Sequence, residues 1–268
     1  MNKNLKELVH SNVENNVGYI TFNRPESFNT FNLTLATEFL DCVDKFGKDE
    51  TVRAIVIKGN GKVFSAGGDI KEMLNDIQAG DDRAAYFRSP LIAFGKINQS
   101  LREITKPVLA AVHGSVAGFA FNLMLSCDLI IAEESTRFTQ AFVKLGLSPD
   151  GGGTYFLPRL VGYARACELT MLPTEINAKK ALEWGLINWV VSSNSFENEV
   201  RKIAERLAAG PTLAIGRTKS LLNRTYDYSL TEQIEEERLT QIQNAASENF
   251  EEGIKAFIDK RHPKFSNK

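Results

Sequence analysis

Residues 108–132, VLAAVHGSVAGFAFNLMLSCDLIIA, decide the fold class of this 268-residue chain. The apolar run at 108–112 is typical of a strand that is buried on both faces of a sheet, and residues 128–132, which are apolar after Asp128, predict the next strand. Between them, His113-Gly114 predicts a turn, and residues 118–126 predict a helix that is buried almost throughout. Strands that alternate with helices favour parallel pairing through right-handed crossovers, so the sequence predicts an α/β fold.

The segments before this stretch extend the same alternation of strands and helices. Residues 8–14 and 17–22 predict a hairpin around Asn15-Asn16. Residues 54–57 are continuously apolar and predict another buried strand. Apolar side chains at helical spacing predict a helix between the hairpin and this strand, and they are Leu35, Phe39, Val43 and Phe46.

The last third of the chain has only helical patterning. We therefore predict two units, an α/β core at 1–196 and a helical C-terminal segment at 197–268. The predicted helices of that segment span 197–209, 211–224, 231–246 and 249–260. The residues that signal helix starts within it are Pro211, Ser229 and Ser247.

Composition and charge exclude several classes of protein. The net charge is −1, so there is no overall positive field for nucleic acid or for an anionic membrane. Three cysteines without CxxC or Cys/His spacing argue against a disulfide framework and against a zinc site, and we predict no metal. No signal peptide, peroxisomal address or membrane-spanning run is evident, so we expect a cytoplasmic protein.

Four motifs stand in order along the chain. They are Asn23-Arg24-Pro25-Glu26 with residues 29–32; residues 64–73, FSAGGDIKEM; residues 106–128 around His113-Gly114; and residues 151–162, GGGTYFLPRLVG. With the helical C-terminus ending in residues 260–265, KRHPKF, this set resembles the crotonase superfamily of enoyl-CoA hydratases and isomerases over nearly the whole chain. The resemblance implies a spiral of ββα turns, a C-terminal helical segment used in trimerisation, and a homotrimer or a dimer of trimers.

The resemblance also implies how the reaction is stabilised. Crotonase-like enzymes stabilise a thioester enolate with two main-chain N–H groups, which meet the charge that develops on the thioester oxygen. By position these donors are Ala66, on a glycine-flanked loop, and Phe119, at the start of the buried helix. Relatives commonly have glycine where this chain has Phe119, whose side chain can also be a core aromatic.

One carboxylate stands where the resemblance places catalysis. Hydratases of the family use two glutamates, and the matching positions here are Asn122 and Phe142, neither of which can act as a general base. Asp150 lies eight residues beyond Phe142, where several isomerases of the family carry their working carboxylate. The surrounding sequence looks closest to the epoxyphenylacetyl-CoA isomerase group. We expect burial near Phe142 to raise the pKa of Asp150 toward the working range of a base.

Other residues are candidates for binding the acyl-CoA substrate. Arg24 can hold CoA phosphates with its guanidinium, Ile70 can offer main-chain contacts to adenine, and Asn122 can bind an acyl group or satisfy a buried helix. Asp69 is expected mainly to cap a helix. The full predicted set of substrate and CoA-binding residues is Arg24, Phe28, Ser65, Ala66, Asp69, Ile70, Asn122, Phe142, Phe257 and Lys260.

The predicted function is therefore an acyl-CoA isomerase that shifts a double bond, or rearranges an epoxide or ring, through proton transfer by Asp150. No cofactor is expected beyond the CoA of the substrate. The alternatives are an enoyl- or dienoyl-CoA hydratase or lyase, and an aryl-CoA dehalogenase in which Asp150 is the nucleophile. An RNA-binding role is disfavoured because the sequence has no basic stripe.

Overall fold

The main sheet of the computed structural model has six strands, in the order β1-β2-β3-β4-β6-β9. The structure describes residues 7–80, 82 and 84–267. β1 and β2 are antiparallel and the other neighbouring pairs are parallel, which confirms the predicted hairpin and α/β fold. The strands are β1 Val9–Glu14, β2 Val17–Phe22, β3 Ala54–Gly59, β4 Val108–Val112, β6 Leu129–Glu133 and β9 Trp189–Val191.

A smaller sheet runs beside the main one. It contains β5 (Ser115–Ala117), β7 (Arg137–Thr139) and β8 (Ile176–Asn177) in that order. The chain passes from β4 into β5 and from β6 into β7, so successive turns give one strand to each sheet. This is the predicted spiral of ββα turns.

Helices cover both faces of the main sheet. On one face, α1 (Leu33–Lys48), α3 (Ala85–Glu103) and α4 (Phe119–Leu125) share one apolar core with alternate residues of the strands. On the other face, α8 (Phe196–Ala209) packs against the remaining strand residues in a second core. The other helices of this part are α2 Ile70–Ala79, α5 Gly153–Val161, α6 Tyr163–Met171 and α7 Ala178–Glu183.

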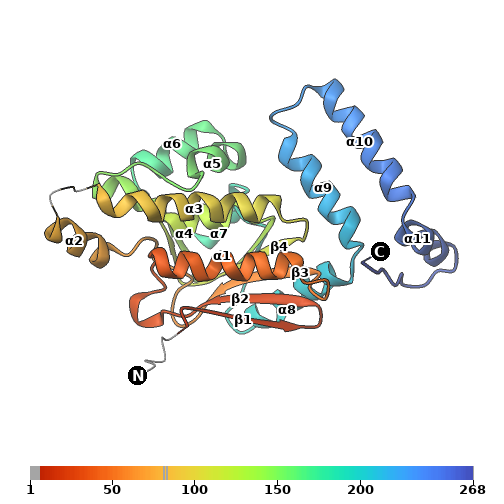
Figure 1. The fold of residues 1–268 in the computed structure, drawn as a ribbon, viewed down its shortest axis with the longest axis horizontal. Helices are drawn as coiled ribbons and strands as arrows, with labels where there is room; N and C mark the ends of the chain where they lie inside the picture. Colours follow the sequence, from red (N-terminus) through yellow and green to blue (C-terminus); the bar gives the residue numbers. More distant parts are fainter. Residues whose placement is uncertain (1–6, 81, 83, 268) are drawn as a thin grey trace.

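The C-terminal segment continues with α9 (Thr212–Arg224), α10 (Leu230–Ala245) and α11 (Glu248–Ile258), which extend away from the sheet (Figure 1). The predicted helices agree with α8–α11 to within two residues at each end. The predicted starts at Pro211, Ser229 and Ser247 are the N-caps of α9, α10 and α11. Helix α8 belongs to the predicted C-terminal segment, but it packs on the sheet of the core. The predicted division into two units at residues 196/197 therefore stays a prediction.

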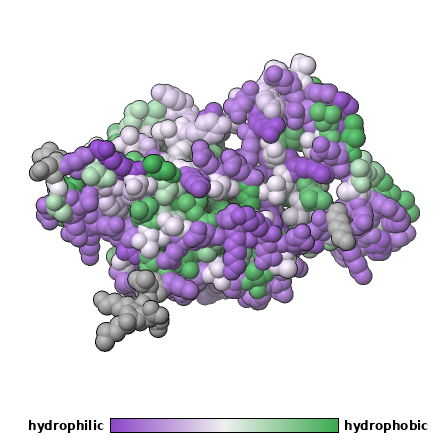
Figure 2. Space-filling view, in the orientation of Figure 1, coloured by the Kyte–Doolittle hydropathy of each residue, from purple (hydrophilic) through white to green (hydrophobic). Residues whose placement is uncertain are grey.

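The last two helices leave apolar side chains on the surface. Figure 2 shows apolar residues exposed over α10 and α11, and α10 has no buried residue. Ile242 is 56% exposed and Phe257 is 87% exposed. Among residues 7–80, 82 and 84–267, the structure contains no helix long and apolar enough to cross a membrane.

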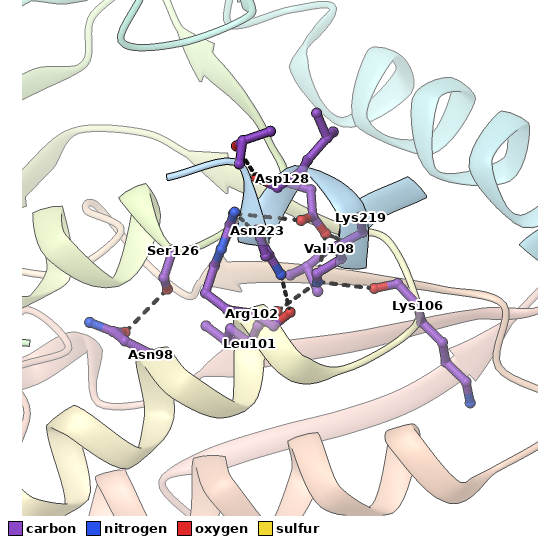
Figure 3. A network of polar contacts seen from close by, with 12 residues as sticks. Asn98, Leu101, Arg102, Lys106, Val108, Ser126, Asp128, Lys219 and Asn223 are labelled. Carbon is purple, nitrogen blue, oxygen red and sulfur yellow. Dashed lines mark hydrogen bonds and ion pairs between the residues drawn. The ribbon is translucent and has the colours of Figure 1, made fainter. Parts of the chain in front are cut away.

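Helix α9 is fixed to the core through the buried ammonium of Lys219 (Figure 3). Its Nζ donates to the carbonyl of Leu101 at 2.6 Å and to the Asp128 carboxylate at 2.8 Å. The helix approaches so closely that a Cβ on Gly216 would lie 2.1 Å from the carbonyl oxygen of Thr105. Only glycine fits there, so α9 is held in one position against the core.

Candidate active site

Two loops meet at the centre of the candidate site. The Ser65 N–H donates to Ser115 at 3.2 Å, and the Ala117 N–H donates to Ser65 at 3.1 Å, which aligns the Ala66 loop with β5. Gly67 has a φ of 92°, and a Cβ there would lie 2.7 Å from the Ala117 carbonyl oxygen. Glycine is required by both the backbone angle and the close approach. The Ala66 loop therefore lies directly beside the entrance to α4.

The two predicted oxyanion donors, the main-chain N–H groups of Phe119 and Ala66, differ in whether they already have a hydrogen-bond acceptor. Phe119 is the first residue of α4, and no acceptor for its N–H is found in the described part of the chain. The Ala66 N–H donates to the carbonyl of Phe28 at 3.0 Å. Phe28 adopts a left-handed φ of 52°, within the short turn that carries this carbonyl. Ala66 can therefore reach a substrate oxygen only by exchanging or sharing its bond to Phe28.

The side chain of Phe119 is buried in the core, which was one of the two roles expected for this residue. Its ring stacks on Phe94 at a centroid distance of 4.2 Å and meets Phe31 edge-on at 4.9 Å. These contacts fix the first turn of α4 and hence the direction of the Phe119 N–H. The main-chain and core roles of this residue are compatible.

Asp150 lies on the loop between the short helix η2 (Ala141–Leu145) and α5. The residue is partly exposed, but its Oδ1 is buried and has no hydrogen-bond partner in the part of the chain that the structure describes. Burial raises the pKa of Asp150 to about 7, while its own main-chain N–H acts in the opposite direction. The shift has the predicted direction, and it makes the carboxylate a stronger base near neutral pH.

Asn122 and Phe142 stand at the two positions where the resemblance places hydratase glutamates, and neither side chain is an acid. Asn122 is fully buried, and its Nδ2 donates to the main-chain carbonyl of Asp150 at 2.9 Å. Its Oδ1 accepts a hydrogen bond from Gln140 at 2.6 Å. The buried Phe142 ring approaches the Ala66 side of the site, since a Cβ on Gly118 would lie 4.0 Å from its Cζ. Asn122 thus supports the Asp150 loop from inside, and Phe142 supplies apolar surface.

Arg24 and Asp69 form a pair next to the site. The Asp69 side chain accepts from the Glu72 N–H at 3.2 Å and so caps α2, as predicted. Arg24 donates to Asp69 at 2.9 Å and to the Thr30 carbonyl at 2.7 Å. Burial alone would raise the pKa of Asp69, but the bonds from Glu72 and Arg24 lower it overall. Because its guanidinium already has internal partners, the phosphate-binding role of Arg24 stays a prediction.

The remaining predicted residues fall into two places. Ser65 is buried and donates to the Asn29 carbonyl at 2.7 Å, which stabilises the turn beneath Ala66. Phe28 and Ile70 are each 54% exposed on the Ala66 side of the molecule. Helix α11, which carries Phe257, lies at the opposite end of the molecule from α2 (Figure 1), and Lys260 follows two residues after that helix. Within one copy of the chain they do not join the site.

Sequence reasoning missed Asn98 and Gln140. The Asn98 side chain donates to the Gly151 carbonyl, next to the one held by Asn122. The available signal was its helical register, because Asn98 shares the buried face of α3 with Phe94 and Leu101. A polar residue on such a face needs a buried partner. Local sequence could not identify that partner.

Comparison with known proteins gives the family of this chain. The family model for enoyl-CoA hydratase/isomerase matches residues 12–268. The chain belongs to the enoyl-CoA hydratase/isomerase family. It has the crotonase fold that the sequence predicted, and an enoyl-CoA hydratase from Polaromonas sp. JS666 matches it with a TM-score of 0.90 at 31% identity, over 96% of this chain and 99% of that one.

Relatives of this family member include isomerases. A trans-2-decenoyl-[acyl-carrier-protein] isomerase from Streptococcus mutans is 37% identical, over 98% of this chain and 99% of that protein. A 1,2-epoxyphenylacetyl-CoA isomerase from Escherichia coli is 35% identical, over 98% of this chain and 100% of that protein. Hydratases and 4-chlorobenzoyl-coenzyme A dehalogenases also match. Similarity by itself therefore supports an activity of this family but does not identify which of its reactions the chain catalyses.

Proposed function

We propose that this family member is an isomerase of unsaturated acyl thioesters, with Asp150 as its single proton-transfer group. The observation that carries the proposal is the buried, unpartnered Oδ1 of Asp150, together with a pKa raised to about 7. A carboxylate with these properties is poised to accept and return a proton near neutral pH. Two of the relatives are named as isomerases, which is consistent with the proposal.

The reaction needs only groups that this chain carries. Asp150 removes a proton from the acyl chain, and the electron pair moves through the double bond onto the thioester oxygen. The N–H groups of Phe119 and, once released from Phe28, of Ala66 stabilise that oxygen. The protonated Asp150 then returns the proton two carbons away. The double bond moves, and no atom is gained or lost.

Hydration fits this site less well. Adding water across a double bond places a hydroxyl and a proton on neighbouring carbons, for which the family's hydratases use two glutamates. Phe142 carries no acid, and both ends of the Asn122 amide are already bonded, to Asp150 and to Gln140. A site with one base, and with no second group among the described residues to hold a water molecule, favours proton transfer over the addition of water.

The substrate is proposed as a thioester whose carrier is CoA. Acyl-carrier-protein is the other candidate carrier, because one of the isomerase relatives is named for it. Arg24 and Ile70 stay proposed contacts for CoA. The trimeric or hexameric assembly, in which Phe257 and Lys260 would reach CoA bound to a neighbouring copy, stays a proposal, as does a cytoplasmic location.

A substrate panel with one matched pair of variants tests this function. Purified protein is incubated with 3-decenoyl, 2-decenoyl, dienoyl, epoxyphenylacetyl and 4-chlorobenzoyl thioesters, and mass and ultraviolet spectra are read together. We expect an isomer of unchanged mass, and a loss of about 10³-fold in kcat for Asp150→Asn. Asp44→Asn, on the exposed side of α1, serves as the control. Addition of water, release of chloride, or near-normal activity of Asp150→Asn would overturn the proposal.

A further inference from the structure

Two successive main-chain carbonyls of the catalytic loop are held by buried asparagines. Asn122, fully buried on α4, donates to the carbonyl of Asp150 at 2.9 Å. Asn98, 3% exposed on α3, donates to the carbonyl of Gly151. The two side chains come from different helices and meet adjacent peptide units. The loop is therefore fixed from two directions just where the carboxylate leaves the main chain.

The direction of both amides is set by a second layer of hydrogen bonds. Gln140 donates to the Oδ1 of Asn122 at 2.6 Å, which leaves the Asn122 NH₂ group to face Asp150. The Ser126 hydroxyl, whose proton is shared with the Leu123 carbonyl at 2.6 Å, lies 3.2 Å from the Oδ1 of Asn98 (Figure 3), and the Asn98 NH₂ group faces Gly151. Each asparagine thus has its acceptor side occupied by the core and its donor side presented to the loop.

The glycines after Asp150 are explained by the same contact. A Cβ on Gly151 would lie 2.8 Å from the Asn98 Nδ2, and Gly151 also has a left-handed φ of 52°. A Cβ on Gly153 would lie 2.3 Å from the Asn122 Oδ1. Both distances are shorter than the non-bonded contacts that real Cβ atoms make. The main chain therefore approaches the two amides as closely as glycine permits.

We propose that Asn98 and Asn122 are positioning residues that clamp the main chain at Asp150 and Gly151, and so hold the catalytic carboxylate in its dry site. The inference rests on the proposed function and deepens it. The Asp150 Oδ1 has no partner among the described side chains, and no charged side chain contributes to the shift of its pKa. Its orientation must therefore come from the main chain. Asn122, where hydratases of the family carry a glutamate, here supports the base of an isomerase.

The clamp is tested with Asn122→Leu and, because that variant leaves Gln140 without an acceptor and can fail to fold, with Asn98→Leu. The pKa of Asp150 is measured without substrate, from the infrared band of its protonated carboxyl, identified by its absence in Asp150→Asn. We expect water to enter the loosened loop and the pKa to fall by about one unit from its value near 7. We also expect kcat to fall about 10²-fold with KM within about twofold, since a misplaced group loses rate rather than binding.

The control is Asn177→Ala, which removes the side-chain cap of α7 and lowers stability away from the loop. It should lower Tm without moving the Asp150 band. If both clamp variants fold and keep the pKa and kcat of the parent, the clamp is wrong, although the proposed function stands. If the parent does not isomerise any thioester but the band still shifts in the variants, the proposed function fails and the clamp stands.

Discussion

Asp128 and Asp150 are two carboxylates of one chain, placed in opposite surroundings. Asp128, 18% exposed, accepts from the Val108 N–H and the Lys219 ammonium at 2.8 Å each, and Arg102 lies 3.8 Å away. Asp150 has a buried Oδ1 with no partner in the described part of the chain. The first carboxylate joins α9 to the core, and the second is free to exchange a proton. Partners make Asp128 structural, and the absence of partners among the described residues leaves Asp150 available for the proton transfer that we propose.

The cost of each arrangement follows from desolvation. A buried charge is tolerated when an opposite charge and hydrogen bonds replace water, as they do around Asp128. Burial lowers the pKa of Lys219, and Asp128 opposes that shift, so the pair keeps its charges together. Asp150 lacks such compensation, and its pKa rises instead. The stability given up there is the physical basis of its proposed reactivity.

The largest effect is expected from breaking the Asp128 pair. Lys219→Met should lower the free energy of unfolding by about 3–5 kcal/mol, because it leaves Asp128 buried without its main cation. Urea unfolding measures the change. Lys202→Met breaks an exposed pair with Glu199 and should cost less than about 1 kcal/mol. Equal losses in the two variants would show that Asp128 is no more dependent on its partner than a surface acid.

The opposite sign is expected at Asp150. Its folded pKa of about 7 lies above the ordinary 3.8, so the folded state binds the proton more tightly and wild-type stability falls as pH rises between those values. Asp150→Asn cannot ionise, and it should gain on the wild type by up to about 4 kcal/mol across that window. Thermal unfolding at pH 4 and pH 8 gives the difference. A gap that stays constant with pH would mean that Asp150 is not desolvated.

The difference between these two acids was only partly readable from sequence. Continuous apolar runs predicted the buried strands, and apolar side chains at helical spacing predicted the C-terminal helices. The resemblance to the family predicted Asp150 as the candidate catalytic carboxylate. The Lys219–Asp128 pair spans 91 residues and the Asn98–Gly151 bond spans 53, so neither leaves a local pattern. Arg24 likewise looked free for phosphate until the fold placed Asp69 beside it.

The smallest effect concerns the second cation near Asp128. Arg102 is 30% exposed and 3.8 Å from Asp128, so Arg102→Met should cost only about 1 kcal/mol in the wild-type background. In the Lys219→Met background Arg102 is the one cation left near this carboxylate within the described chain, and the same substitution should cost more. A double-mutant cycle on urea unfolding isolates the coupling. Strictly additive losses would mean that Lys219 alone compensates Asp128, and that the Arg102 side chain stabilises α9 only by donating to the Asn223 side-chain oxygen.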